Sequence, residues 1–214
     1  MKILVLTDSL GLPRDLPEEV LYEDTWVSLL SDEHVLLQSS IGGGTSFDLY
    51  KQMAYLKAFK PEIVLLQVGI VDCAPRALQY HENIFLNHYK VSRKLTNILL
   101  SKFGDQIRKL RNISYINLKN FKDNLKNIIS TYPEAKFIFI GIIPASDEYE
   151  NKLKNIKKRV ELYNKEAKLL FNETFIDNSD FDFSFIMPDH HHLNKKGHFF
   201  LYKKIKNFIS QNHE

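Results

Sequence analysis

Apolar residues along this chain follow two patterns: short continuous runs, and longer stretches in which they recur every three or four positions. Residues 63–66 (Ile-Val-Leu-Leu) and 137–140 (Phe-Ile-Phe-Ile) are continuously apolar, as strands buried on both faces of a sheet must be. The runs predict five strands, at 2–6, 34–38, 62–68, 136–142 and 174–177. The periodic stretches predict helices at 46–57, 118–132, 148–171 and 195–211.

This alternation of strands and helices favours an α/β fold with a doubly wound, mainly parallel, five-stranded sheet and helices on both faces. Prolines lie near the boundaries of the predicted elements, where they are tolerated. A chain of 214 residues is most simply one domain, and we take 1–214 as that domain. The functional groups of such folds gather at the carboxyl ends of the strands.

The segment at about 76–112 fits the alternation poorly and is expected to be a mostly helical insertion. It carries eight Lys or Arg residues against two acidic ones, Glu82 and Asp105. Charge runs usually mark solvated faces, which favours an exposed helical excursion. The alternative is a lid or wall that steers an anionic substrate toward the site. The sequence does not separate the two.

Composition excludes several classes of protein. A net charge of +3 and the lack of a basic, aromatic-rich cluster argue against a nucleic-acid partner. A single cysteine, Cys73, leaves no intrachain disulfide and suits a reducing compartment. Neither a signal peptide nor a stretch of membrane-spanning length is recognised, so a cytoplasmic protein is the expectation. Nothing in the composition bears on the oligomeric state.

Two motifs at opposite ends of the chain carry matching chemistry. Residues 7–11 (Thr-Asp-Ser-Leu-Gly) follow the first predicted strand in a small-residue turn that can expose a hydroxyl. Residues 189–194 (Asp-His-His-His-Leu-Asn) place a carboxylate three positions before an imidazole. A nucleophile, a base and a group that orients the base are the parts an acyl-transfer enzyme needs.

Four blocks of the sequence, in order and over essentially the whole chain, resemble those of the SGNH (GDSL-like) hydrolases, a family of serine esterases and acyl-transfer enzymes. The blocks are residues 8–10, residues 40–46 (Ser-Ile-Gly-Gly-Gly-Thr-Ser), residues 69–72 (Gly-Ile-Val-Asp) and residues 189–198. The resemblance implies the flavodoxin-like fold of that family. It also implies that Ser9 is the nucleophile, His192 the general base and Asp189 the residue that orients the base.

The same resemblance implies an oxyanion hole formed by the backbone N–H groups of Ser9 and Gly43. The family's third donor is an asparagine side chain, and Val71 occupies that position here. Because valine offers no donor, weakened activity is expected. Thr7 also replaces a usual glycine. Three neighbouring residues are candidate substrate-binding groups: Asp8, Asp72 and Arg76. Arg76 is close enough in sequence to reach the oxyanion or a substrate carboxylate.

We therefore predict a serine-dependent acyl-ester hydrolase or O-acyltransferase that needs no cofactor or metal. The polar, basic insertion and the lack of a long apolar lid favour a small-molecule or glycan substrate, such as an O-acetylated carbohydrate or glycoconjugate. A ligand-binding protein without turnover on the same scaffold is the alternative, because of Val71. A metal site at residues 190–192 is disfavoured because no Cys or Glu completes a tetrahedral set. Cys73 is expected to be a packed, bystander thiol.

Overall fold

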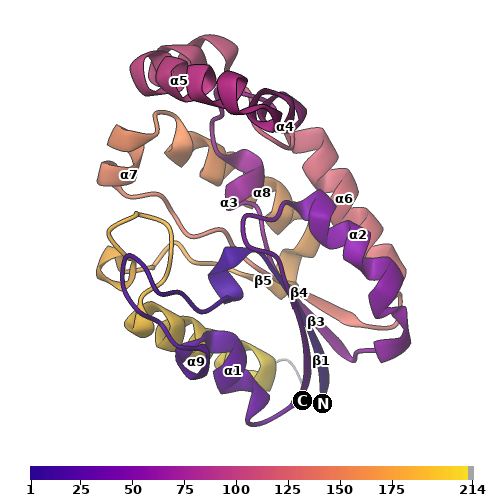
Figure 1. Cartoon of the computed structure of the whole chain (residues 1–214). Coiled ribbons are helices and arrows are strands. Elements are labelled where there is room, and N and C mark those ends of the chain that lie inside the picture. The colour runs from indigo at the N-terminus through magenta and orange to yellow at the C-terminus, as the bar shows by residue number, and fades with distance from the viewer. Residues whose placement is uncertain (212–214) are drawn as a thin grey trace.

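Five parallel strands form one sheet in the order β2-β1-β3-β4-β5, and helices cover both of its faces (Figure 1). The structure is a computed structural model and describes residues 1–211. The strands are β1 (Lys2–Thr7), β2 (Val35–Ser40), β3 (Ile63–Gln67), β4 (Lys136–Ile140) and β5 (Phe175–Ile176). Both apolar runs lie in the middle of the sheet as β3 and β4, which confirms the predicted parallel α/β fold.

Two layers of helices enclose the sheet, and each buries an apolar stripe against it. One face carries α1 (Trp26–Ser31) and α9 (Lys195–Gln211), and the other carries α2 (Ser46–Leu56), α6 (Leu118–Thr131) and α8 (Ile156–Phe171) (Figure 1). Trp26 of α1 and Leu201 of α9 are fully buried in the first layer, and Phe121 of α6 packs edge-on against Phe139 of β4 in the second. The periodicity of these helices therefore marks their buried faces.

The structure differs from the sequence-based expectations at three places. The helix expected at 148–171 is divided into α7 (Asp147–Lys152) and α8, because Asn155 adopts a left-handed conformation with φ 73° between them. Asparagine tolerates this conformation better than most residues, so a periodic sequence does not exclude such a break. Helix α1 was not predicted, since its six residues are too short for a periodic signal. The last strand is reduced to two residues.

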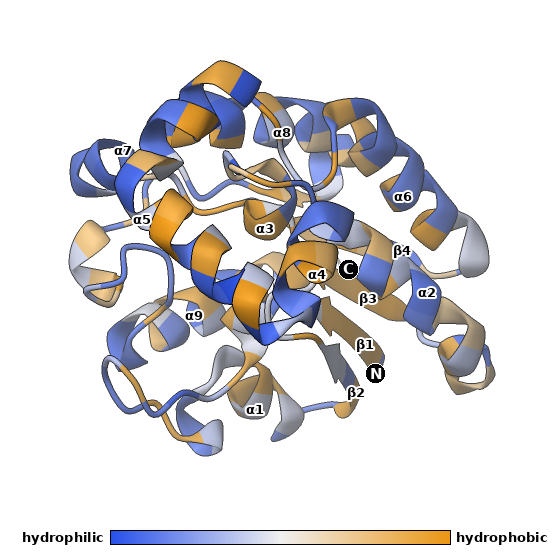
Figure 2. Ribbon diagram, turned by 45° about the horizontal axis from the view of Figure 1, so that its top comes forward, coloured by the Kyte–Doolittle hydropathy of each residue, from blue (hydrophilic) through white to orange (hydrophobic). Residues whose placement is uncertain are grey.

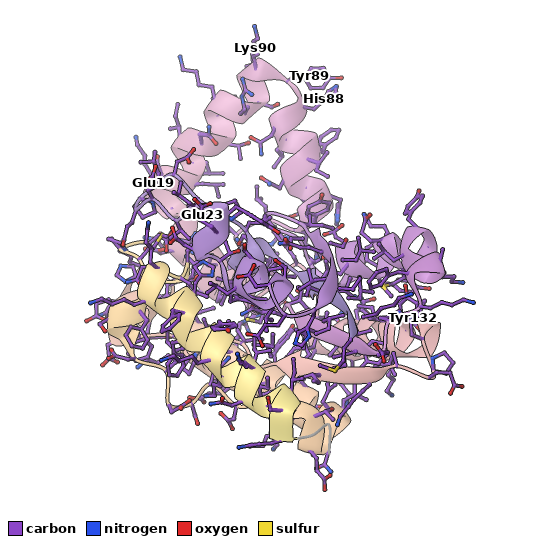
Figure 3. All side chains as sticks on the ribbon, turned by 90° about the horizontal axis from the view of Figure 1, so that it is seen from below. Glu19, Glu23, His88, Tyr89, Lys90 and Tyr132 are labelled. Carbon is purple, nitrogen blue, oxygen red and sulfur yellow. The ribbon has the colours of Figure 1, made fainter. Side chains whose placement is uncertain are left out.

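The segment 76–112 contains a helical hairpin, α4 (Tyr80–His88) and α5 (Lys90–Arg111), whose helices pack mainly on each other. Its tip, with His88, Tyr89 and Lys90, lies away from the body of the protein (Figure 3). Apolar segments alternate with polar ones along α5 (Figure 2). Several apolar side chains of the hairpin are exposed, including Phe85 on α4 and Val91 and Leu110 on α5. Among the helices of residues 1–211, none has the length and hydrophobicity that a bilayer crossing requires.

Candidate active site

The carboxyl ends of three strands lie side by side and bring together segments that are far apart in sequence. Thr7 at the end of β1 pairs with Ser40 at the end of β2 and with Gln67 at the end of β3. The sheet order reverses here, because β2 and β3 flank β1 on opposite sides. A reversal of this kind opens a crevice at the carboxyl edge of a parallel sheet. The loops that follow the three strands carry Ser9, Gly43 and Val71.

A tight turn holds Ser9 at the end of β1. The residues Ser9–Gly11 form a short 3-10 helix, and Asp8 caps it by accepting a hydrogen bond from the Leu10 N–H at 2.9 Å. The Thr7 hydroxyl is buried and bonds the Ser40 hydroxyl at 2.6 Å, which ties the turn to β2. A Cβ at Gly11 would lie 2.3 Å from the Thr7 Oγ1 atom. The Thr7 side chain therefore requires a glycine at position 11.

The loop between residues 185 and 194 aims Asp189 and His192 at this turn. The loop closes through an antiparallel bridge between Ile186 and Leu193 and a 2.7 Å bond from the Met187 N–H to the His192 carbonyl. His190 reverses the chain with φ 73°, a conformation that histidine adopts more readily than most residues. Past the loop, the Asn194 side chain accepts the Gly197 N–H at 3.0 Å and so begins α9. The whole motif is thus a rigid support for one carboxylate and one imidazole.

Ser9, His192 and Asp189 form a continuous hydrogen-bonded chain. The Ser9 Oγ atom lies 2.9 Å from His192 Nε2, and His192 Nδ1 lies 2.7 Å from Asp189 Oδ2. The other carboxylate oxygen accepts the backbone N–H groups of His191 and His192 at 3.1 and 3.0 Å. A carboxylate held by two fixed N–H groups keeps its second oxygen pointed at the imidazole. This is the geometry in which a serine, a base and an orienting carboxylate perform acyl transfer.

Arg14 makes a further contact with this chain that sequence reasoning missed. Its Nη2 atom lies 2.6 Å from His192 Nε2. A guanidinium only donates hydrogen bonds, so Nε2 accepts and the ring proton sits on Nδ1, facing Asp189. The Ser9 hydroxyl, with Oγ 2.9 Å from the same nitrogen, therefore competes with Arg14 for its single lone pair. No motif marks Arg14, which lies in an otherwise acidic loop, and only the fold brings it to the site.

The electrostatics favour a neutral imidazole beside an ionised carboxylate. Burial, followed by repulsion from His191, lowers the pKa of His192 to about 4. Burial alone would raise the pKa of Asp189, but its hydrogen bonds from the backbone and ring of His192 hold the pKa of that carboxyl at about 2. At neutral pH, His192 is therefore uncharged, and its Nε2 carries a lone pair and no proton.

The three positions of the implied oxyanion hole, Ser9, Gly43 and Val71, line the same pocket. Gly43 lines the pocket with φ +67°, and a Cβ built there would meet nothing within 4 Å. The Ser9 N–H is at the first position of its turn, where backbone donors have no partner within the helix. Val71 lines the same pocket at the start of α3 (Ile70–Cys73), so the position expected to hold a third donor presents only methyl groups.

The structure places Asp8 and Asp72 away from the pocket, contrary to their expected role in substrate binding. Both side chains are fully buried. Asp8 caps the Ser9 turn, and Asp72 accepts the N–H of Ser46 at 3.0 Å and its hydroxyl at 2.5 Å, which joins α3 to the start of α2. Burial raises the pKa of each carboxyl to about 7. Their contacts hold loops in position.

The third candidate, Arg76, does line the pocket. The guanidinium of Arg76 lies over the Tyr115 ring at 4.3 Å, and its Nη2 donates to the Val71 carbonyl at 3.4 Å. The pocket has a volume of about 420 Å³ and is lined by Ser9, His192, Arg14, Arg76 and a set of apolar and aromatic side chains. A larger cavity of about 530 Å³ lies beside α8 and β5 and contains none of the predicted site residues.

Two other chemistries were possible from the sequence: a metal site at the histidines and a nucleophilic Cys73. Atoms of Asp189, His191 and His192 lie within 4.8 Å of one another, close enough for a metal ion. However, the Oδ2 and Nδ1 atoms of this group already bond each other, and His192 Nε2 faces Ser9. Cys73 is buried, and burial raises the pKa of its thiol, so it stays protonated at neutral pH.

Comparisons with known proteins give a match in structure only. No protein-family model and no curated protein matches the sequence. Among solved structures, a lipase/acylhydrolase from Enterococcus faecalis is 18% identical with a TM-score of 0.65, over 95% of this chain and 92% of its own. The esterase EstA from Pseudoalteromonas sp., in a structure inhibited by monoethylphosphonate, is 19% identical with a TM-score of 0.61, over 98% and 97%.

An acetyl xylan esterase, AlAXEase, gives a similar match: 17% identity and a TM-score of 0.61, over 97% of this chain and 98% of its own. These similarities span nearly the full length of both chains, which shows that the fold is that of SGNH (GDSL-like) acylhydrolases. The resemblance predicted from the four sequence blocks is confirmed at the level of the fold.

Proposed function

We propose that this protein is a serine-dependent acyl-ester hydrolase, or an acyltransferase with the same first step. The observation that carries the proposal is the chain of hydrogen bonds from Ser9 through His192 to Asp189, on a fold shared with esterases and acylhydrolases. It joins residues 183 positions apart at one pocket. The neutral state of His192 supports its role as the base.

The reaction follows from the geometry in two halves. Ser9 Oγ attacks the ester carbonyl while its proton passes to His192 Nε2, and Asp189 stabilises the imidazolium that forms. The negative charge on the carbonyl oxygen is held by the N–H groups of Ser9 and Gly43. His192 then gives the proton to the departing alcohol, which leaves the acyl group on Ser9. Water, or a second alcohol, then loses a proton to His192 and attacks the acyl carbonyl. His192 returns that proton to Ser9 Oγ as the bond between Oγ and the acyl group breaks.

We propose an O-acetyl or similarly short acyl group on a carbohydrate or glycoconjugate as the substrate. The volume of about 420 Å³ suits a small acyl group with one sugar unit, and the polar groups of Arg14, Arg76 and His191 in the lining suit a hydroxyl-rich partner. Beyond Ile70, the neighbouring space near Ile142 and Ile143 is only about 10 Å³, too small for a long acyl chain. One structural neighbour is an acetyl xylan esterase.

The test is hydrolysis of p-nitrophenyl acetate by the wild type, Ser9→Ala and His192→Ala, with labelling by an organophosphonate. We expect turnover that is lost in both variants, and a phosphonate adduct on Ser9 located by mass spectrometry. Labelling without turnover would indicate an activated serine that needs a specific acceptor or substrate, hence a transferase or a narrow esterase. Turnover that survives Ser9→Ala would refute the proposed nucleophile.

A binding protein on the same scaffold is the second candidate, and Val71 is the observation that favours it. Loss of one oxyanion donor typically lowers turnover by about 10² to 10³. A protein that binds acyl esters without turnover would give neither hydrolysis nor a phosphonate adduct, because its serine would not be activated.

A further inference from the structure

Two arginines in the pocket lack the partners that arginines near a reactive site usually have. Within residues 1–211, no carboxylate forms an ion pair with Arg14 or Arg76. The Nε atom of Arg76 is buried without a hydrogen-bond partner, and no acidic residue of this part of the chain lines the pocket. Because neither guanidinium has a carboxylate partner in the described part of the chain, the pocket carries uncompensated positive charge and favours a ligand with a negative charge.

The backbones of both arginines are anchored beside the pocket. The backbone of Arg14 is fixed by two bonds to Val20, at 2.9 and 2.7 Å, so only its side chain is free to swing. Arg76 is held by the Tyr115 ring and by a backbone bridge to Ile113. Planar guanidiniums with several free N–H groups match carboxylate and phosphate oxygens well.

We propose that the pocket recognises acyl esters that carry an anionic group, a carboxylate or a phosphate, and that Arg14 and Arg76 bind that group. This inference rests on the proposed acyl-ester function and names its substrate class. Arg14 and Arg76, which form no ion pair with a carboxylate of residues 1–211, would bind the part of the substrate that does not react.

The contact of Arg14 with His192 gives this binding a second consequence. Arg14 occupies the lone pair of Nε2 that must accept the Ser9 proton, and its positive charge opposes the imidazolium that follows. An anion in the pocket draws the guanidinium away and frees the nitrogen. The charged substrate thereby activates the base, whereas a neutral ester does not attract Arg14 away from His192 and is turned over more slowly.

Binding is tested first, on a protein that cannot turn over. Ser9→Ala protein is titrated by calorimetry with a mono-O-acetylated methyl glucoside, its 6-carboxylate analogue and its 6-phosphate analogue. We expect the charged compounds to bind about 10- to 100-fold more tightly than the neutral one, and that preference to fall below about threefold when Arg14→Gln or Arg76→Gln is added. The tighter of the two charged compounds identifies the anion. Equal affinity for all three would overturn the proposal.

Kinetics then test the role of Arg14. In an Arg14→Gln variant with intact Ser9, kcat for the neutral ester should rise, while kcat/KM for the charged ester should fall. A fall in both by the same factor would refute the release of His192. Arg108→Gln removes the same charge from α5, where it pairs with Asp105, and should leave the charge preference unchanged.

The two proposals fail separately. A preference for the charged compound in Ser9→Ala, with no turnover or labelling in the wild type, would contradict the acyl-ester function alone. Turnover without any charge preference would contradict the anion site alone.

Discussion

Replacing Asp189 by asparagine tests how the carboxylate acts on His192. The Asp189 Oδ1 atom accepts two backbone N–H groups, those of His191 and His192. In Asp189→Asn, the amide oxygen keeps these bonds, because turning the amide would lose two hydrogen bonds worth about 0.5–1.5 kcal/mol each. The amide nitrogen is then left facing His192 Nδ1. Two donors cannot face one another, so the ring proton moves from Nδ1 to Nε2.

A proton on Nε2 disables the base, since that nitrogen no longer accepts the Ser9 proton. We expect kcat for p-nitrophenyl acetate to fall about 10³- to 10⁴-fold, equivalent to about 4–5.5 kcal/mol of barrier. The protonated Nε2 also faces the Arg14 N–H, which adds a repulsive contact. Because the backbone bonds persist, the free energy of unfolding measured in urea should change by less than about 1 kcal/mol.

Asp182→Asn is the matched control. Asp182 lies in the same loop region and caps its turn by accepting the Ser184 N–H at 2.8 Å, without contact to a histidine. Its turnover should stay within about threefold of the wild type. If Asp189→Asn kept turnover within tenfold of the wild type while remaining folded, the orienting role of Asp189 would be wrong.

Three further predictions concern the base, the oxyanion hole and a buried carboxylate. The kcat/KM for p-nitrophenyl acetate should rise with pH through about 4, as His192 loses its proton, and then stay level to pH 8; a rise centred near pH 6.5 would contradict this. Val71→Asn should raise kcat at least about tenfold by adding a donor, whereas Val71→Leu, which has none, should not; equal rates would refute the reasoning. Asp72→Asn should cost less stability at pH 8.5 than at pH 5.5 in urea unfolding, because the raised pKa of about 7 makes the wild type bury a charge at high pH; a cost independent of pH would contradict the raised pKa.

Much of the fold could be predicted because it depends on patterns that act locally. The continuously apolar runs in β3 and β4 indicate strands covered on both faces, and the periodic stretches in α2, α6 and α9 match the observed helices closely. The predictions failed where one residue or a short element decided the structure. Asn155 divides α7 from α8 through a left-handed backbone, and the six residues of α1 carry no readable period.

The amino-acid sequence identifies which residue types can form a nucleophile, a base and an orienting carboxylate, and the order in which they follow the strands. It does so because a hydroxyl after a strand and a carboxylate three residues before a histidine are local patterns. The burial of Asp8 and Asp72 among loops, and the contact of Arg14 with His192, are visible only in the folded protein. Those positions depend on which loops meet at the sheet edge, a question of long-range packing that no local pattern records.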